Sequence, residues 1–165
     1  MNTDWDQVQN FLYDVTKTGK LDTLKVDPLI KSGFDINLWG SSELEEPIVS
    51  LVRDYESIFY LVNHNYQITG EDMCNIFLNT QDVRFVNLLV SHLNINATLD
   101  LNYKNEPLNV LDIALEATSL FDTKNLDIIK LLIKKGAKMG TPLDKNWKYY
   151  KEFYDILSSN GYMFN

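Results

Sequence analysis

Histidine and cysteine, the side chains that most often bind transition metals or act as catalysts, are almost missing from this chain. It has two histidines, His64 and His92, and one cysteine, Cys74. A zinc site takes at least three His, Cys or carboxylate ligands that converge on one point, so we predict no metal site and no cofactor. A single cysteine also excludes an internal disulfide, and we expect Cys74 to be a small buried residue of the core.

Catalytic motifs and long apolar runs are lacking as well. The sequence has no G-x-S-x-G, no phosphate-binding loop, no G-x-G-x-x-G and no H-E-x-x-H, so we predict a protein that is not an enzyme and has no catalytic residues. A hydrolase that uses scattered carboxylates ranks last among the alternatives. No run reaches the roughly 18 apolar residues that would span a bilayer, and the acidic start, Met1 to Asp6, does not look like a signal peptide. We therefore expect a cytoplasmic protein without a membrane partner.

Positive charge is scarce. The chain has 15 Lys and Arg and 23 Asp and Glu, which gives a net charge of −8. Residues 1–72 carry a net −8, residues 73–120 a net −3 and residues 121–165 a net +3. Nucleic-acid binding needs clustered Lys and Arg, so we predict no nucleic-acid partner. The acidic body favours a basic protein surface, which long-range attraction would steer toward it.

What the sequence does have is a helix with a marked end, at Leu126 to Gly140. Leu126, Ile129 and Ile133 recur at helical spacing and predict an apolar face. Gly136 can take a left-handed conformation without steric cost and is expected to end the helix.

The same helix ending occurs five times. An apolar residue follows each helix-ending position, and another lies two places further on. These positions lie 32, 27, 44 and 25 residues apart, and a period near ~33 residues is typical of a helical array. Glycine and asparagine tolerate the left-handed conformation best, and histidine is enriched there. The helix-ending positions are Gly33, Asn65, His92, Gly136 and Gly161.

These endings, of the form L-Φ-x-x-G-Φ-x-Φ-N with Φ apolar, resemble those of the ankyrin-repeat family. Thr141-Pro142-Leu143-Asp144 matches the T-P-L-H opening of that family with Asp in place of His, and Val110 to Ala114 is a looser match. The resemblance implies an all-α fold, an ankyrin-like solenoid of stacked helix-turn-helix repeats with protruding loops. It implies one domain over 1–165, with repeats at about 4–37, 38–69, 70–96, 97–140 and 141–165.

The pattern predicts a helix pair in each repeat and two long loops, Asn37 to Glu46 and Asn96 to Pro107. Pro28 is expected to kink the second helix. The last pair is expected to follow Thr141. The earlier helices are predicted at 5–17, 21–32, 47–54, 57–63, 71–79, 82–91, 108–118 and from 126 to the cap at 136.

The two long loops carry the residues that we predict to bind a partner. An indole beside acidic groups, Trp39 near a glutamate cluster, is a better interface anchor than an ordinary surface feature, although a solvated charged loop is the plain alternative. If the repeats stack in register, both loops project to one edge. The predicted partner-binding residues are Trp39, Glu43, Glu45, Glu46, Asp100, Tyr103 and Glu106.

The ankyrin resemblance implies that the concave face binds other proteins. Our first hypothesis is a protein-interaction module, and its concrete version is an acidic inhibitor or immunity protein that blocks a basic partner such as a cationic toxin. The alternative is a scaffold or adaptor that associates through its aromatic C-terminal repeat, which holds seven of the 20 aromatic residues. We favour the interpretation that these rings seal the end of the stack and that the protein is a monomer.

Overall fold

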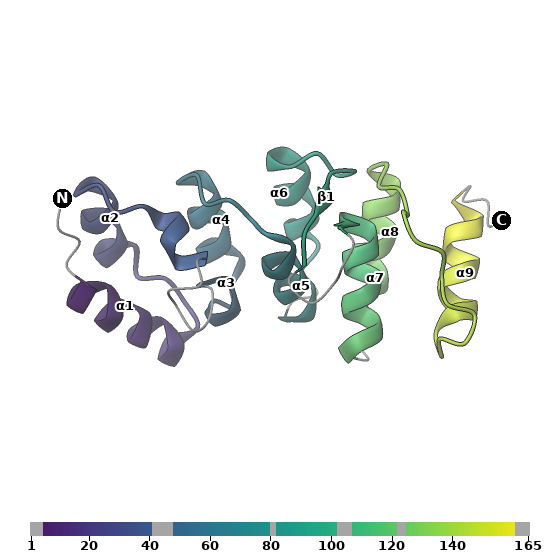
Figure 1. Cartoon of the computed structure of the whole chain (residues 1–165), viewed down its shortest axis with the longest axis horizontal. Helices are drawn as coiled ribbons and strands as arrows, with labels where there is room; N and C mark the ends of the chain where they lie inside the picture. Colours follow the sequence, from purple (N-terminus) through teal and green to yellow (C-terminus); the bar gives the residue numbers. More distant parts are fainter. Residues whose placement is uncertain (1–4, 41–47, 80–81, 102–106, 122–124, 161–165) are drawn as a thin grey trace. The chain divides into compact units, whose positions relative to one another are not determined.

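The computed structural model describes residues 5–40, 48–79, 82–101, 107–121 and 125–160. The chain divides into two compact units, Met1–Ile68 and Thr69–Asn165. Both consist mainly of helices, and a two-stranded ladder is the one addition to them in the described ranges (Figure 1). The prediction of a mainly α-helical protein is therefore confirmed. In the described ranges, no helix has the length and apolar character that a bilayer crossing requires.

The first unit contains four α-helices and a 3-10 helix in its described part. Val8, Phe11 and Val15 recur along one face of the first helix and are at most 3% exposed. The first helix contacts the third, which also contacts the 3-10 helix. The elements are α1 (Trp5–Thr18), α2 (Thr23–Lys31), η1 (Ile36–Gly40), α3 (Ile48–Leu51) and α4 (Tyr55–Asn63).

The second unit contains five α-helices and the ladder in its described part. Helix α7 contacts both α5 and α8, and α6 also contacts α8 (Figure 1). The ladder is antiparallel, with Thr98 opposite Asn109 and Leu99 opposite Leu108; its first strand lies in the loop predicted at 96–107, so the sequence pattern missed it. The elements are α5 (Gly70–Asn79), α6 (Arg84–His92), β1 (Thr98–Leu99), β2 (Leu108–Asn109), α7 (Val110–Phe121), α8 (Leu126–Lys134) and α9 (Tyr150–Ser159).

Three of the predicted helix endings have the left-handed conformation. The backbone φ is +93° at Gly33, +66° at Asn65 and +91° at Gly136. In each case the following residue donates its N–H to a carbonyl five positions back, as in a Schellman cap. These bonds are 3.0 Å long and join Phe34 to Leu29, Tyr66 to Leu61 and Ala137 to Leu132.

The helix α6 ends at His92, but the left-handed turn predicted there was wrong. His92 is the last residue of α6, and the next residue, Leu93, leaves the helix in an extended conformation with φ −126°. A β-carbon in the left-handed region meets the following carbonyl, and this repeat has neither glycine nor asparagine at that position. Gly161 lies outside the described residues.

The predicted final helix pair was also wrong, because only its second helix, α9, forms. Residues 141–149 form no helix and consist of bends, turns and a stretch without regular structure. Pro142 has no N–H and restricts the residue before it. The side chain of Asp144 accepts a hydrogen bond from the backbone N–H of Asn146 at 2.8 Å, a local turn that competes with a helix.

Asn37, four residues after its helix ending, ties that turn to the next one in the first unit. Its side-chain NH₂ donates to the carbonyl of Asn65 at 3.4 Å, and its side-chain oxygen accepts the N–H of Gln67 at 2.8 Å. The carboxylate of Asp35 accepts the N–H of Asn37 at 2.9 Å and holds the asparagine in place.

Asn96 repeats this arrangement in the second unit. Its NH₂ donates to the carbonyl of Gly136 at 3.2 Å, and its oxygen accepts the N–H of Lys138 at 2.8 Å. The side chain of Asn94 takes the place of Asp35 and accepts the N–H of Asn96 at 3.0 Å. The same pair of bonds therefore occurs once in each unit, at equivalent positions of the sequence pattern.

We expect Asn37→Ala and Asn96→Ala each to lower the free energy of unfolding by about 1–2 kcal/mol, because each change removes two hydrogen bonds to backbone groups. Urea unfolding measures the change. Asn10→Ala is the matched control, since Asn10 is exposed on α1, and its effect should stay within about 0.5 kcal/mol. Equal effects of all three substitutions would show that the two asparagines do not brace the turns.

Candidate partner-binding site

Only two of the seven predicted binding residues lie in the part of the chain that the structure describes. Trp39 belongs to η1 in the first unit, and Asp100 is an exposed residue after β1 in the second. A common edge formed by the two loops stays a prediction. The other five, Glu43, Glu45, Glu46, Tyr103 and Glu106, lie outside the described residues.

The surroundings of Cys74 and His64 indicate structural roles for both residues. Cys74 is buried, as predicted. The ring of His64 stacks on Tyr60 with 4.0 Å between centroids, and its Nδ1 lies 2.8 Å from the carbonyl oxygen of Tyr60. Across the described ranges, no three His, Cys, Asp or Glu residues come together in a way that could hold a metal ion.

A distinct site forms where the start of α7 meets the segment after α8. Asn109 ends β2, and its side-chain oxygen accepts the N–H of Asp112 at 3.0 Å. This bond satisfies one of the N–H groups that the first turn of a helix leaves without an intrahelical partner. It also fixes Asp112 in the first turn of α7, where the positive end of the helix dipole stabilises a carboxylate.

The carboxylate of Asp112 holds the segment that follows α8. Its Oδ1 accepts the N–H of Gly140 at 3.0 Å and that of Thr141 at 3.2 Å, and its Oδ2 also lies 3.0 Å from the nitrogen of Gly140. Asp112 is 4% exposed, and a buried carboxylate needs such donors. A β-carbon on Gly140 would lie 2.8 Å from Oδ2 of Asp112, so this close approach requires glycine.

The segment then turns and places Asp144 and Trp147 beside α7. The backbone N–H of Trp147 donates to the carbonyl of Asp144 at 3.0 Å. The indole of Trp147 stacks on Phe153 of α9, with centroids 4.8 Å apart and planes 16° from parallel, and Phe153 is fully buried. The indole Nε1 is buried without a hydrogen-bond partner among the described residues, so the orientation of the ring is set by stacking.

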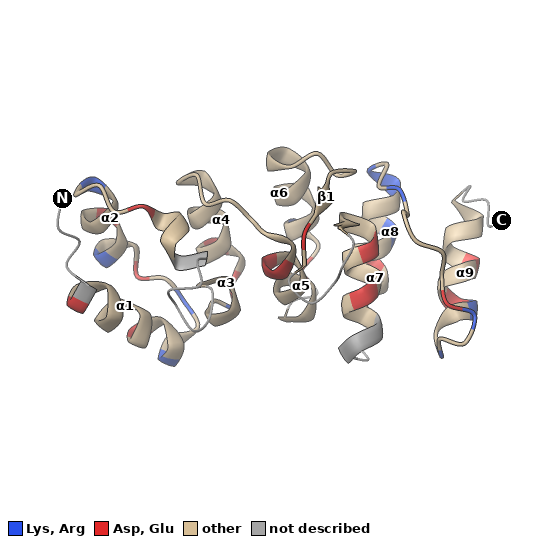
Figure 2. Cartoon of the chain, in the orientation of Figure 1, with Lys and Arg blue, Asp and Glu red and all other residues tan. Residues whose placement is uncertain are grey.

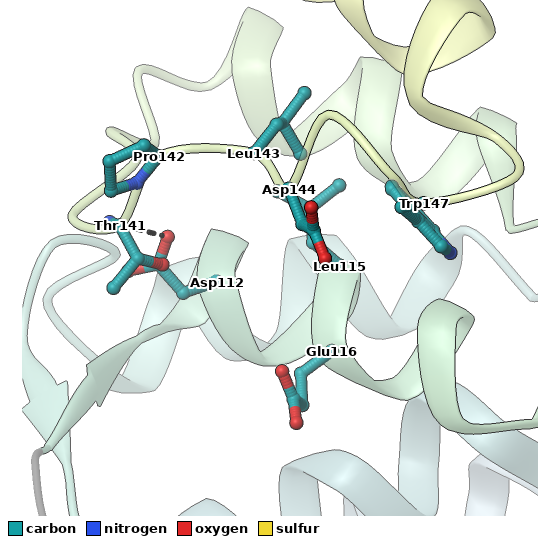
Figure 3. A pocket seen from close by; sticks show the side chains of 8 residues that line it. All are labelled: Asp112, Leu115, Glu116, Thr141, Pro142, Leu143, Asp144 and Trp147. Atoms are coloured by element: carbon teal, nitrogen blue, oxygen red, sulfur yellow. Dashed lines mark hydrogen bonds between the residues drawn. The ribbon is translucent and has the colours of Figure 1, made fainter.

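Between α7 and this segment lies a pocket of about 200 Å³. Figure 3 shows Asp144 and Trp147 on the segment above the turn of α7 that carries Leu115 and Glu116. Three of the lining residues are acidic, and none of the described residues that line the pocket is basic. Carboxylates that line one hollow give it a negative potential. The lining residues are Asp112, Leu115, Glu116, Thr141, Pro142, Leu143, Asp144 and Trp147.

Sequence reasoning did not identify this pocket. It noted Asp144 as a departure from a motif and Trp147 as one of the terminal aromatic residues, but it gave neither of them a role in binding. Asp112 and Glu116 are four residues apart, a spacing that places both on one face of a helix. That spacing was the available signal. The loop that completes the pocket had been taken for a helix.

A second hollow, of about 350 Å³, lies between α1 and α2 and is mostly apolar. At its edge Lys25 and Asp14 form an ion pair of 2.5 Å. The hydrogen bond and the charge of Lys25 lower the pKa of Asp14, and Asp14 in turn raises the pKa of Lys25. The two charges cancel, so this hollow gives no preference for a charged partner. The pocket beside α7 is therefore the stronger candidate site.

We expect Asp112→Ala to release the segment after α8. The change removes a buried acceptor of backbone N–H groups and should lower the free energy of unfolding by about 2–3 kcal/mol. Amide hydrogen exchange should show a loss of protection at Gly140 and Thr141. Asp144→Ala is the control, because Asp144 is exposed and should cost less than about 1 kcal/mol. Unchanged protection in the Asp112 variant would contradict the anchoring role.

The chain matches no protein-family model, and no curated protein or solved structure is significantly similar to it. The function has to be argued from the pocket, the repeated turns and the charge of the chain.

Proposed function

We propose that this protein is a non-enzymatic interaction module that binds a partner with a basic surface and blocks it. On this proposal the chain is a divergent ankyrin-type array that acts as an acidic inhibitor, in the manner of an immunity protein. The observation that carries the proposal is the pocket beside α7, which presents Asp112, Glu116 and Asp144 together.

The repeated turns support the array. Asn37 and Asn96 make the same two bonds to the turn that follows in each unit. Stacked repeats of this kind depend on such contacts between neighbours, and they expose loops and inner helices to a partner.

Charge supports the choice of a basic partner. The net charge of −8 gives a long-range attraction, and the pocket gives the same sign at short range. Figure 2 shows acidic residues on α7 and a basic group at the end of α8. The exposed lysines there, Lys134, Lys135 and Lys138, lie in the last turn of α8 and beyond it and are not among the lining residues of the pocket.

The scaffold alternative depends on aromatic side chains of the last repeat that are free to bind. Trp147 and Phe153 are stacked on each other, and Phe153 is fully buried. These two rings pack within the second unit, as the sealing interpretation expects. No observation favours the scaffold alternative over the inhibitor.

Affinity capture with the purified chain, followed by calorimetry with each purified candidate, tests the proposal. We expect a partner with an isoelectric point above about 9 that binds one to one. The affinity should fall at least tenfold between 50 and about 300 mM salt, since charged surfaces are screened.

Two charge-reversal variants locate the contact. The first changes Glu43, Glu45 and Glu46 to Lys, and the second changes Glu116 and Asp144 to Lys. Weaker binding by the first supports the predicted loop, and weaker binding by the second supports the pocket. Affinity for basic proteins that is unchanged in both variants, or the absence of any basic partner, would overturn the proposed function.

A further inference from the structure

We propose that Asn160 is a site of spontaneous chemical modification, at which loss of ammonia produces aspartate or isoaspartate and loosens the end of α9. The inference does not depend on the proposed function. It rests on two observations. Glycine follows Asn160 in the sequence, and the side chain of Asn160 closes the last turn of the helix.

The sequence singles out Asn160 among the asparagines of the chain, because it is the one that glycine follows. The reaction begins when the backbone nitrogen of the next residue attacks the side-chain carbonyl carbon of asparagine. A side chain on that next residue hinders the attack. Glycine has none, and it gives the backbone more conformational freedom than other residues do. Asparagine is a thermolabile residue in proteins, and Asn160 has the neighbour that most favours its reaction.

The reaction has two steps, and hydroxide and water are the other reactants. In the first step, hydroxide takes the proton of the backbone nitrogen of Gly161, and this nitrogen bonds to Cγ of Asn160. The bond between Cγ and the side-chain nitrogen breaks, and ammonia leaves after taking a proton from water, which restores the hydroxide. In the second step, water opens the cyclic imide at either of its carbonyls. Each chain loses one ammonia, gains one water and acquires one negative charge.

The position of Asn160 in the fold gives this reaction access. Asn160 is exposed and lies directly after Ser159, the last residue of α9. Its ψ is 16°, and its side-chain NH₂ donates to the carbonyl of Ile156 at 2.7 Å. Ring closure needs this bond to open and the backbone to rotate about the Cα–C bond of Asn160. Helix ends fray, so the reactive conformation is reached without unfolding the rest of the chain.

The hydrogen bond to Ile156 also explains why the modification changes the structure. The last carbonyls of a helix have no intrahelical partner. That of Ile156 accepts the side chains of Asn160 and Ser159, at 2.7 and 2.9 Å. An aspartate carboxylate has no N–H to donate, and it places a negative charge at the negative end of the helix dipole. The modified side chain therefore opposes the turn that asparagine closes.

The last turn of α9 connects this change to the core of the second unit. The backbone N–H of Asn160 donates to the carbonyl of Leu157 at 3.0 Å, and Leu157 is fully buried. Phe153, one turn earlier, is also fully buried and carries the stack with Trp147. Opening of the last turn weakens the hold on Leu157 first, so we expect the loosening to begin there.

Peptide mass spectrometry of the full chain, incubated at near-neutral and at mildly alkaline pH, tests the chemistry. We expect Asn160 to convert faster than the other asparagines, and faster at the higher pH because the attacking nitrogen must lose its proton. Asn146 is the control within the same sample, since it is exposed and outside a helix but is followed by Trp147. Gly161→Val should slow the conversion at least about tenfold, which corresponds to a barrier higher by about 1.4 kcal/mol.

Amide hydrogen exchange of Asn160→Asp tests the structural consequence without waiting for the reaction. The protection factors of Ser158 and Ser159 should fall at least about threefold, because the variant loses a hydrogen bond and adds an unfavourable charge at the helix end. Asn10→Asp adds the same charge at an exposed position on α1 in the other unit. It should leave the protection of both serines unchanged.

The modification site is refuted if Asn160 converts no faster than Asn146, or if Gly161→Val leaves its rate unchanged. Equal protection of Ser158 and Ser159 in Asn160→Asp and in the unmodified chain overturns the loosening of α9. Neither result bears on the proposed function, which depends on capture of a basic partner.

Discussion

The left-handed turn that ends a helix is the constraint on which the described fold depends. At Gly33, Asn65 and Gly136 the backbone takes a left-handed conformation. The next residue then donates its N–H to a carbonyl of the helix that has just ended. Such a turn exposes carbonyl and N–H groups that need partners. Asn37 supplies those partners to the turn at Asn65, and Asn96 supplies them to the turn at Gly136. At Asn65 and Gly136 the turn therefore ends a helix and also accepts a side chain from about 30 to 40 residues earlier in the chain.

The candidate site arises where this pattern changes. The position equivalent to Asn37 is occupied by Gly140, so no side chain is available there to brace the turn that follows. The missing β-carbon lets the backbone approach the carboxylate of Asp112, which accepts the N–H groups of Gly140 and Thr141. The segment then continues without a helix as far as Tyr149. Because no inner helix covers this part of α7, a pocket remains beside it, with Trp147 as one wall.

Much of the fold could be read from the sequence because its signals are local. The spacing of Leu126, Ile129 and Ile133 predicted α8, and the residue type alone predicted the turns at Gly33 and Gly136. The prediction at His92 failed because histidine, although enriched in the left-handed conformation, has a β-carbon and adopts it less readily than glycine. The prediction of the last inner helix failed because the family pattern was given more weight than Pro142 and the turn at Asp144.

The pocket could not be predicted for a different reason. Its walls come from α7 and from a segment about 30 residues later in the sequence, and they meet where the carboxylate of Asp112 accepts the N–H groups of Gly140 and Thr141. Loop composition had directed attention to Trp39 and its glutamates, which are neighbours in sequence. A site that depends on tertiary hydrogen bonds between distant segments leaves no comparable local pattern.

A crystal structure of the chain bound to a captured basic protein would decide between the pocket and the loops. We predict that a basic surface of the partner covers the pocket beside α7, which Glu116, Asp144 and Trp147 line. A complex in which the partner binds elsewhere and leaves this pocket to solvent would contradict the account.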